Sequence, residues 1–429
     1  MATRSADGQT GSSGDMAAAP LARHGRLAAS HATTTFLKVL GIGLSVVLVS
    51  TAVVAGIAIW DVASNLKPGV SLPNDTAGPV PQISAIEGGV NLLLVGSDSG
   101  EGDPRYGARG EHLNDVTILL HLAQDHGSAT VVSFPRDMLV EIPKCPALDD
   151  GSADGTDGGF TDKMNTTLSH GGLGCTVATV EELTGLTIPF AAEIEFNGVI
   201  EMSNAVGGVP VCVAEPIEDD YTGIVLEAGP HVLQGWEALQ FLRTRYGLKN
   251  GSDLARIGNQ QAFLSSLVRT IRSEGTLNDP FKLYSLAKAA ASNMVLSKQL
   301  RPLDTMVSIA SALKDIDLNK VTFLQYPVDE VSGGLEPLTG DATVLFDALA
   351  ADIPVTLSGQ LGQATESATE SVPGAPPTDA TPEPTDTTTK TTAPPVDGTD
   401  PPVILLPSTI PGQTAAEHTC TVGRPPSQQ

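Results

Sequence analysis

The chain has 429 residues, in which 24 lysines and arginines stand against 49 aspartates and glutamates, and its formal net charge is −25. Because so acidic a chain repels phosphate backbones, the composition argues against a general nucleic-acid-binding protein. Charged residues make up 17% of the chain and apolar residues 41%, so most of it can bury a hydrophobic core, and the length allows two or three domains.

The first predicted element is a transmembrane helix over residues 39–60, an uncharged apolar run. At about 1.5 Å per residue, a helix of this length spans about 30 Å, the thickness of the hydrocarbon core of a bilayer. The preceding segment, 1–38, has more basic than acidic residues. This excess predicts a cytoplasmic N-terminus and places everything after Trp60 outside the cell.

Two other interpretations of this run stay open, a cleaved signal peptide and a buried core helix. The run is longer than the roughly 7–15-residue apolar core of a signal peptide, and no convincing small-residue cleavage site follows it. We therefore predict an uncleaved anchor and a single-pass protein of the cell membrane with a large extracytoplasmic part.

The organisation of the remainder follows from changes in pattern. Residues 61–88 contain proline and glycine with little periodicity, which predicts a spacer that lifts the folded part off the membrane. From 89 to 357, strand-like and helix-like segments alternate, which favours an α/β domain with three α/β/α layers around a central mixed sheet. We expect strands at 90–95, 116–122, 130–134, 209–213 and 321–326, and helices at 176–183, 235–243, 254–273, 280–294 and 302–313.

Residues 358–429 form the last predicted region. Much of it is rich in threonine and proline, as in the run TPEPTDTTTKTTAPP. Such a composition buries too little apolar surface to offset the entropy of the chain, so we expect a disordered extracytoplasmic tail.

The four cysteines, Cys145, Cys175, Cys212 and Cys420, lie on the predicted extracytoplasmic side, where disulfides form. No CxxC pair occurs, which argues against a zinc knuckle or a thioredoxin-like site. We favour a bridge between Cys145 and Cys175, because these two residues flank an acidic, glycine-rich insertion, but the other connectivities stay open.

Charged residues at the ends of apolar runs are the first candidates for chemistry, since the sequence has no P-loop, no HExxH motif and no GxSxG elbow. Asp98 and Asp115 stand at the ends of two runs, and Arg136 and Asp137 follow a third. Ligands gather outside strand ends in α/β folds. The two carboxylates Asp98 and Asp115 suit Mg²⁺ or Mn²⁺ together with phosphate oxygens, the alternative being that each serves as a turn or cap residue.

A second group of charged residues surrounds the sequence RTRY. Arg243 and Arg245 lie two positions apart and would point the same way in extended backbone, while Arg256 and Gln260 share one face of a predicted helix. Converging guanidinium groups repel each other unless an anion lies between them, and a pyrophosphate matches their paired donors. The alternative is a solvated helix end whose arginines pair with neighbouring carboxylates.

Taken together, these motifs resemble the LytR-CpsA-Psr family of cell-wall glycopolymer ligases, and the cysteine-containing segments look like its actinobacterial branch. The matching stretches follow the family order over roughly residues 90–275. They read NLLLVGSDS, NDVTILLHL, VVSFPRDMLVEIP, MNTTLSHGGLGC, VEELTGL, AVGGVPV, GWEALQFLRTRY and DLARIGNQQAFL.

The resemblance implies a hydrophobic pocket for a polyprenyl chain. It also implies transfer of a glycopolymer from a polyprenyl-pyrophosphate carrier to peptidoglycan, usually to the muramic acid C6 hydroxyl. Asp98 and Asp115 match the family's acidic, magnesium-associated positions, Arg136 matches the arginine of its PRD motif, and Arg243 and Arg245 match its RxR motif. Three further residues match the family's D-x-x-R-x-x-x-Q segment: Asp253, Arg256 and Gln260.

The chain departs from the family at Gly100, Leu113 and Asn259, where the family often has arginine. The pyrophosphate clamp is therefore expected to hold fewer arginines, unless Arg105 or Arg109 of a glycine-rich insertion completes it. A surface position is the alternative for both of these residues.

The resulting expectation is a magnesium-assisted phosphotransferase outside the membrane. Mg²⁺ at Asp98 and Asp115 would neutralise the leaving polyprenyl phosphate, the four matched arginines would hold the pyrophosphate, and Asp98 or Asp137 would accept the proton of the acceptor hydroxyl. Its partners would be the lipid-linked donor, peptidoglycan and the membrane.

Three other functions stay open. A hydrolase of the polyprenyl pyrophosphate would use the same site, and a non-catalytic protein that binds wall polymer or lipid would use the same fold. A membrane-bound transcriptional attenuator is the third, but the segment 1–38 is too short for a helix-turn-helix and is rich in serine, glycine and alanine.

Overall fold

The computed structural model describes residues 32–73, 75, 89–98, 112–148, 153–272, 279–368 and 403–424. The chain divides into two compact units, Met1–Ile57 and Ala58–Gln429. Helix α1 (Ala32–Asn65) begins in the first unit and ends in the second. It contains the predicted span 39–60, and its segment Thr34–Asn65 is long and apolar enough to cross a membrane.

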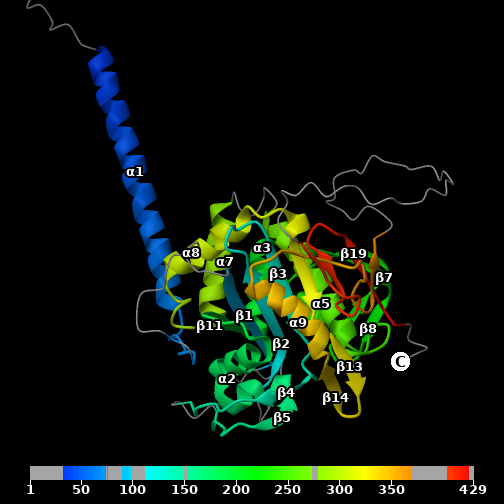
Figure 1. The fold of residues 1–429 in the computed structure, drawn as a ribbon. Coiled ribbons are helices and arrows are strands. Elements are labelled where there is room, and N and C mark those ends of the chain that lie inside the picture. The colour runs from blue at the N-terminus through cyan, green and yellow to red at the C-terminus, as the bar shows by residue number, and fades with distance from the viewer. Residues whose placement is uncertain are drawn as a thin grey trace, which may run out of the picture. The chain divides into compact units, whose positions relative to one another are not determined.

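The second unit is built on a mixed sheet. Its strands are β1 (Val90–Ser97), β2 (Asn114–Leu122), β3 (Ala129–Phe134), β6 (Phe190–Ile194), β11 (Met294–Leu296), β12 (Val321–Gln325) and β18 (Gly412–Thr414). Among the described residues they run in the order β11-β6-β1-β2-β3-β12-β18 (Figure 1). Strand β1 pairs parallel with β6 and antiparallel with β2, and β3 pairs parallel with β12. The predicted strands 90–95, 116–122, 130–134 and 321–326 are confirmed, because apolar runs buried on both faces form central strands.

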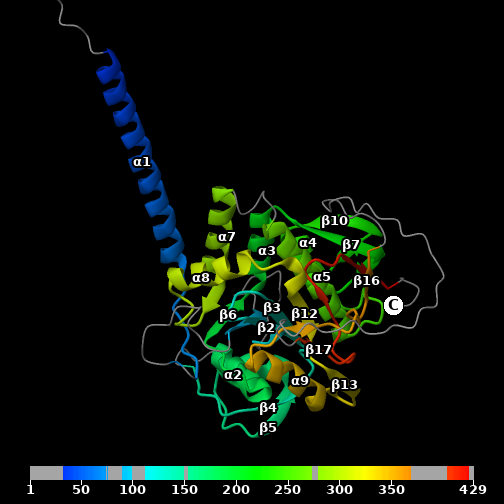
Figure 2. The ribbon, with the colours of Figure 1, turned by 45° about the horizontal axis from the view of Figure 1, so that its top comes forward.

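Helices cover both faces of this sheet. They are α2 (Thr167–Thr184), α3 (Phe196–Val206), α4 (Gly235–Arg243), α5 (Asp253–Arg272), α7 (Pro280–Asn293), α8 (Leu303–Lys314) and α9 (Thr339–Ala350). The core on one face joins the sheet to α2 and α9, as through Leu93 and Phe346, and the core on the other joins it to α8 and α5, as through Leu120 and Ile309. Figure 2 shows these helices on the two sides of the sheet. The predicted mixed α/β fold with three layers is confirmed.

The predicted helices differ from the observed ones mainly in α2, which begins at Thr167 and not at 176. Gly171 and Gly172 interrupt it with non-helical backbone, and Gly172 has a φ of 63°. A glycine pair predicts a break, and the break exists, but the chain resumes its helix on the far side. Helices α3 and α9 were not predicted.

Smaller elements complete the unit. They are β4 (Leu139–Ile142), β5 (Phe160–Lys163), β8 (Ile217–Asp219), β9 (Ile224–Leu226), β13 (Val328–Val331), β14 (Gly334–Pro337), β15 (Val355–Thr356), β17 (Ile404–Leu405), and the 3₁₀ turns η3 (Met164–Thr166) and η4 (Leu318–Lys320). A second sheet has the strands β10 (Gly229–Leu233), β7 (Val209–Glu215), β19 (Thr419–Val422) and β16 (Thr365–Ser367), in this order within the described part. The predicted strand 209–213 lies in this sheet and not in the central one.

The prediction of a disordered tail over 358–429 is wrong for residues 358–368 and 403–424. Strand β18 pairs with β12 at the edge of the central sheet, and β19 lies between β7 and β16 (Figure 1). Leu406 and Ile410 are buried in the main core. Averaging composition over the whole region hides these short apolar runs. The threonine- and proline-rich residues 369–402 lie outside the described part of the chain.

The four cysteines form two disulfides. Cys145 is bonded to Cys175, as favoured from the sequence, and the bridge holds the segment after β4 to helix α2. Cys212 of β7 is bonded to Cys420 of β19, where the parallel register of the two strands places them side by side. The second bridge therefore joins residues 208 positions apart and fixes the C-terminal strand to the fold.

The spacer predicted over 61–88 is also wrong in its first part, because the folded unit begins well before residue 89. Val70 N donates to Leu296 O at 2.9 Å and Lys298 N donates to Val70 O at 2.9 Å. Leu72 is 5% exposed and belongs to the main core. These backbone bonds hold the chain after α1 against the strand β11. The remainder of the predicted spacer lies largely outside the described residues.

We expect the double substitution C212A/C420A to lower the free energy of unfolding by about 2–5 kcal/mol, because it releases a closure between distant segments. C145A/C175A is the matched control and encloses a separation of only 30 residues. Its loss should be smaller by about 1.7 kcal/mol. Denaturant unfolding of the detergent-solubilised full chain measures both, and an unchanged midpoint in C212A/C420A would show that the C-terminal strand contributes no stability.

Candidate active site

An apolar cavity of about 280 Å³ opens between the central sheet and helices α3, α4 and α5. Its walls include Leu94, Ile118, Phe196, Leu239, Phe263 and Met294. Seven polar residues also line it, namely Ser97, Asp115, Glu195, Ser203, Arg243, Arg256 and Gln260. A mainly apolar pocket with a few convergent polar groups is the usual form of a small-molecule site.

A β-bulge places Asp115 at this cavity. Gly96 pairs with Val116 and Ser97 pairs with Asn114, so Asp115 is an extra residue in β2. Bulges bend a strand and redirect its side chains. Asn114 and Thr117 are accordingly bonded side chain to side chain at 2.8 Å although they lie three positions apart. The bulge leaves Asp115 free to turn toward α5.

Two arginines from distant parts of the chain meet at the Asp115 carboxylate. Arg136 Nη1, from the turn after β3, lies 2.6 Å from Asp115 Oδ1, and Arg256 Nη1 of α5 lies 3.7 Å from the same oxygen. Asp253 binds both arginines in turn. Its Oδ1 lies 2.5 Å from Arg256 Nη2, and its Oδ2 accepts the backbone N–H of Arg136 at 3.0 Å. Arg256 is only 4% exposed, so the start of α5 is not a solvated helix end. The pairing of an arginine with a neighbouring carboxylate, which that alternative predicted, does occur between Arg256 and Asp253.

Asp137 extends the network to a third arginine. Its carboxylate lies 3.1 Å from Lys163 Nζ and 3.8 Å from Arg245 Nη1. Arg245 Nε also donates to Gly251 O at 2.8 Å, which fixes the guanidinium group at the start of α5. Lys163 was not predicted, because a single lysine at the end of β5 carries no motif.

Arg243 and Arg245 lie at and just after the C-terminal end of helix α4. Arg243 is its last residue, and its Cζ lies 4.3 Å from the centre of the Phe196 ring at the cavity wall. The intervening Thr244 is extended and buried, and its hydroxyl donates to Asp219 Oδ2 at 2.6 Å. The N–H groups of Arg245 and Gly247 donate to the same oxygen. Asp219 therefore positions the RTRY segment, a role that no sequence pattern indicated.

The cluster carries more positive than negative charge. Its cations are Arg136, Lys163, Arg243, Arg245 and Arg256, and its anions are Asp115, Asp137 and Asp253. Among the described residues, Arg136 Nε and Arg256 Nε are buried donors without a hydrogen-bond acceptor. Arg256 lines the cavity, whereas Arg136 Nε lies 3.8 Å from Asp253 Oδ1 and 3.9 Å from Asp137 Oδ2, so both guanidinium groups belong to the buried ion-pair network beside the cavity.

The arginines also set the charge of the carboxylates. Burial opposes ionisation of Asp115, but Arg256 and Arg136 outweigh it and lower the pKa of this carboxyl. Burial likewise opposes ionisation of Asp137, and Lys163, Arg136 and Arg245 together lower its pKa. Both groups are therefore ionised at neutral pH, where they hold the arginines in place.

The remaining predicted residues lie near the cluster in different roles. Asp98 is buried at the end of β1, and its Oδ1 accepts the N–H of Leu113 at 3.0 Å. Gln260 Nε2 donates to Leu242 O at 3.0 Å and so binds α5 to the end of α4. Gly100, Arg105 and Arg109 lie outside the described residues.

Asn259, where the family often has arginine, has a structural role here. Its Nδ2 donates to Phe241 O at 2.6 Å, and its Oδ1 accepts the hydroxyl of Thr421 at 2.9 Å. Asn259 is fully buried and joins α5 to both α4 and β19.

A magnesium ion at Asp98 and Asp115, as expected from the sequence, would have to share the phosphates of a substrate. Asp98 and Asp115 stand at the paired ends of β1 and β2. Within the described residues, no group of three or more histidine, cysteine or acidic side chains is placed to hold a metal ion by itself. Mg²⁺ commonly binds one or two carboxylates and takes its other ligands from water and phosphate oxygens, so two aspartates are sufficient.

Comparison with known proteins identifies the family. The LytR_cpsA_psr family model matches residues 70–350, more than half of the chain. The chain belongs to this family. The cell wall biosynthesis protein LcpA of Corynebacterium glutamicum is 31% identical over 282 residues, which cover 60% of this chain and 52% of LcpA. The polyisoprenyl-teichoic acid–peptidoglycan teichoic acid transferase TagT of Bacillus subtilis is 27% identical over 244 residues, which cover 55% of this chain and 68% of TagT.

The LytR_cpsA_psr fold is also found by structural comparison. The LytR-Csp2A-Psr enzyme from Actinomyces oris superposes with a TM-score of 0.51 at 20% identity, covering 67% of this chain and 96% of that enzyme. This likeness concerns the fold alone. The chain spans about half the length of its curated relatives LcpA and LcpB, 52% and 51% respectively. The family match from residue 70 agrees with the early start of the folded unit.

The lowered pKa values predict acid sensitivity centred on the cluster. Asp115 and Asp137 stabilise the folded state above their unfolded pKa of about 4, and this contribution is lost as the pH falls through their lower folded values. D115N should lose about 3 kcal/mol at pH 7, because Arg136 and Arg256 keep buried charges without their shared partner.

Denaturant unfolding between pH 7 and pH 2 tests this expectation. D115N should lose less of its remaining stability on acidification than the wild type, whereas D347N, at an exposed aspartate of α9, should follow the wild type. Equal acid sensitivity in D115N and the wild type would contradict the assignment.

Proposed function

We propose that this chain is a membrane-anchored, extracytoplasmic phosphotransferase that moves a glycopolymer from a polyprenyl-pyrophosphate carrier to the muramic acid C6 hydroxyl of peptidoglycan. The observation that carries the proposal is the excess of guanidinium groups at the polar end of an apolar cavity. A ligand with a pyrophosphate head and an isoprenoid tail complements this site, because its negative charge lies at one end and its apolar chain at the other. Membership of the LytR_cpsA_psr family and the similarity to TagT, a polyisoprenyl-teichoic acid–peptidoglycan teichoic acid transferase, support this reaction class.

The arginines provide binding and electrostatic stabilisation. Arg136 and Arg256 would direct their unsatisfied Nε donors at the phosphate oxygens beside Asp115, and Arg243 would bind them from the opposite wall. Arg245 would hold the outer phosphate while Asp137 keeps it in position. Fixing the donor in this way aligns its phosphorus with an incoming hydroxyl.

The reaction balances as a single displacement. The C6 hydroxyl oxygen of the acceptor forms a bond to the phosphorus that carries the glycopolymer, and the bond from this phosphorus to the bridging oxygen breaks. Polyprenyl phosphate leaves, and the hydroxyl proton passes to Asp98 or Asp137. Mg²⁺ held by Asp98 and Asp115 would neutralise charge on the phosphate oxygens.

The size of the cavity indicates how much of the carrier enters. Its volume of about 280 Å³ is at the lower end of the roughly 300–1,000 Å³ of small-molecule pockets. In this conformation it accommodates only the first isoprene units, and the remainder of the tail would stay in the bilayer. Helix α1 would anchor the enzyme to the membrane in which the carrier resides.

Substituting Arg243 tests the site and leaves the ion pairs of Asp115 with Arg136 and Arg256 in place. R243A should lower transfer of a polyprenyl-linked glycopolymer to peptidoglycan at least about 100-fold, because one donor to the developing charge is lost. K314A, at an exposed lysine of α8, removes the same charge far from the cluster in sequence and should retain wild-type transfer. Equal transfer by R243A and the wild type, measured on the full chain in detergent, would overturn the proposal.

The same assay separates transfer from hydrolysis. With the donor supplied alone, a transferase releases little polyprenyl phosphate, and adding peptidoglycan should produce polymer attachment in equal amount to the polyprenyl phosphate released. Release that does not depend on peptidoglycan would favour a hydrolase.

Metal binding has a readout that does not need the reaction. In the presence of geranylgeranyl pyrophosphate, the full chain should bind Mn²⁺ in a titration followed by electron paramagnetic resonance. D98N should weaken this binding about tenfold or more, because one of two carboxylate ligands becomes neutral. E141Q, at an exposed glutamate of β4, is the control for charge. Unchanged Mn²⁺ affinity in D98N would exclude Asp98 as a ligand.

A further inference from the structure

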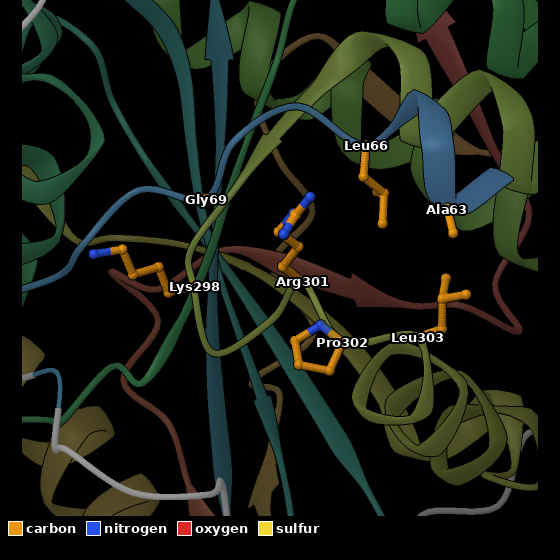
Figure 3. A pocket seen from close by; sticks show the side chains of 7 residues that line it. All are labelled: Ala63, Leu66, Gly69, Lys298, Arg301, Pro302 and Leu303. Atoms are coloured by element: carbon orange, nitrogen blue, oxygen red, sulfur yellow. The ribbon is translucent and has the colours of Figure 1, made fainter. Parts of the chain in front are cut away.

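A second cavity, of about 530 Å³, lies at the C-terminal end of helix α1. It is lined by Ala63, Leu66, Gly69, Lys298, Arg301, Pro302 and Leu303 (Figure 3). It shares none of its lining residues with the cavity at Asp115. The transfer reaction proposed above therefore does not use this cavity.

The lining combines positive charge with an apolar wall. Figure 3 shows the Arg301 side chain between Lys298 on one side and Leu66 and Leu303 on the other. Both Lys298 and Arg301 are exposed to solvent. An anionic group with an attached apolar part complements such a surface.

The start of helix α8 adds to the positive potential. Pro302 is the N-cap of this helix and makes no side-chain capping hydrogen bond, so the N-terminal end of the helix faces the cavity without a side-chain acceptor. Helix N-termini favour anions. Asp304 lies in the first turn, but it is not among the residues that line the cavity.

The chain itself fixes the depth of this cavity relative to the bilayer. The predicted span ends at Trp60, and Ala63 and Leu66 follow three and six positions later. At about 1.5 Å per residue, they stand about 5–9 Å beyond the hydrocarbon core. The headgroup layer on each side of a bilayer is about 5–8 Å thick. With the predicted span in the bilayer, Ala63 and Leu66 would therefore lie at the level of the outer headgroups.

Polar contacts hold the end of α1 in place within the folded unit. Asp61 Oδ2 accepts from Lys288 Nζ at 2.8 Å and from the Tyr284 hydroxyl at 2.5 Å, both on α7. Lys298 Nζ donates to Ser71 Oγ at 2.5 Å, beside the backbone bonds of Val70. These contacts hold the end of α1 and the chain that follows it against α7 and the segment before α8, on either side of the cavity.

We propose that this cavity binds the phosphate headgroup of an anionic phospholipid from the outer leaflet. Arg301 and the start of α8 bind the phosphate, while Ala63, Leu66 and Leu303 contact the glycerol and the first acyl carbons. Lys298, whose ammonium group points away from Arg301 toward Ser71, adds positive potential at the rim. The proposal rests on the membrane anchoring that belongs to the proposed function, but not on the transfer reaction. Its effect is to hold the folded unit in a fixed orientation at the membrane surface.

Native mass spectrometry of the full chain in detergent tests the proposal, with phosphatidylglycerol and phosphatidylcholine as probes. The wild type should retain phosphatidylglycerol at least about tenfold better than phosphatidylcholine. R301E should lose this preference, and K314E, with the same change of charge at the other end of α8, should keep it. Equal retention of the two lipids by the wild type, or unchanged preference in R301E, would overturn the proposal.

Two further measurements distinguish lipid binding from the binding of a soluble anion and from polymer transfer. Inorganic phosphate should not displace the lipid at equal concentration, since it lacks the apolar part; displacement would indicate a site for soluble anions and contradict the proposal. R243A should retain phosphatidylglycerol like the wild type, because Arg243 lines only the other cavity. Lipid binding and polymer transfer can therefore fail independently.

Discussion

The arrangement of the site depends on one buried carboxylate, that of Asp115. A β-bulge turns it out of the regular strand, and Arg136 and Arg256 approach it from the turn after β3 and from helix α5. Burying a charge is unfavourable unless partners compensate it, and here each partner is itself held by Asp253. This pairing fixes α5 against the edge of the sheet, and α5 forms one wall of the apolar cavity.

The same pairing reconciles an acidic protein with phosphate chemistry. The net charge of −25 repels polyanions at long range, but it is a property of the whole chain. Within the cluster the cations exceed the carboxylates, and two buried guanidinium donors have no acceptor in the part of the chain described. Local geometry, and not total charge, therefore decides which anion the protein can bind.

Both ends of the folded unit are attached to its central elements by specific contacts. The segment after α1 pairs with β11, and the C-terminal strand β19 is held by Cys212–Cys420 and by Asn259 of α5. Asn259 thus binds the C-terminal strand directly, so the end of the chain helps to hold α5 in place.

The sequence by itself determined the elements that local pattern controls. Uncharged and continuous apolar runs predicted a helix long and apolar enough to cross a membrane and the strands 90–95, 116–122 and 130–134, and the motifs around Arg136, Arg243 and Arg256 located the charged cluster. The sequence could not predict the β-bulge at Asp115 or the hydrogen bonds by which Asp219 positions the RTRY segment. Nor could it predict the ion pair of Lys163 with Asp137 or the ordered segment 403–424. These depend on pairing between residues far apart in the chain, such as Cys212 and Cys420, 208 positions from each other. Only the tertiary structure decides such contacts, because register and burial are set by the packed whole and leave no periodic signal in the sequence.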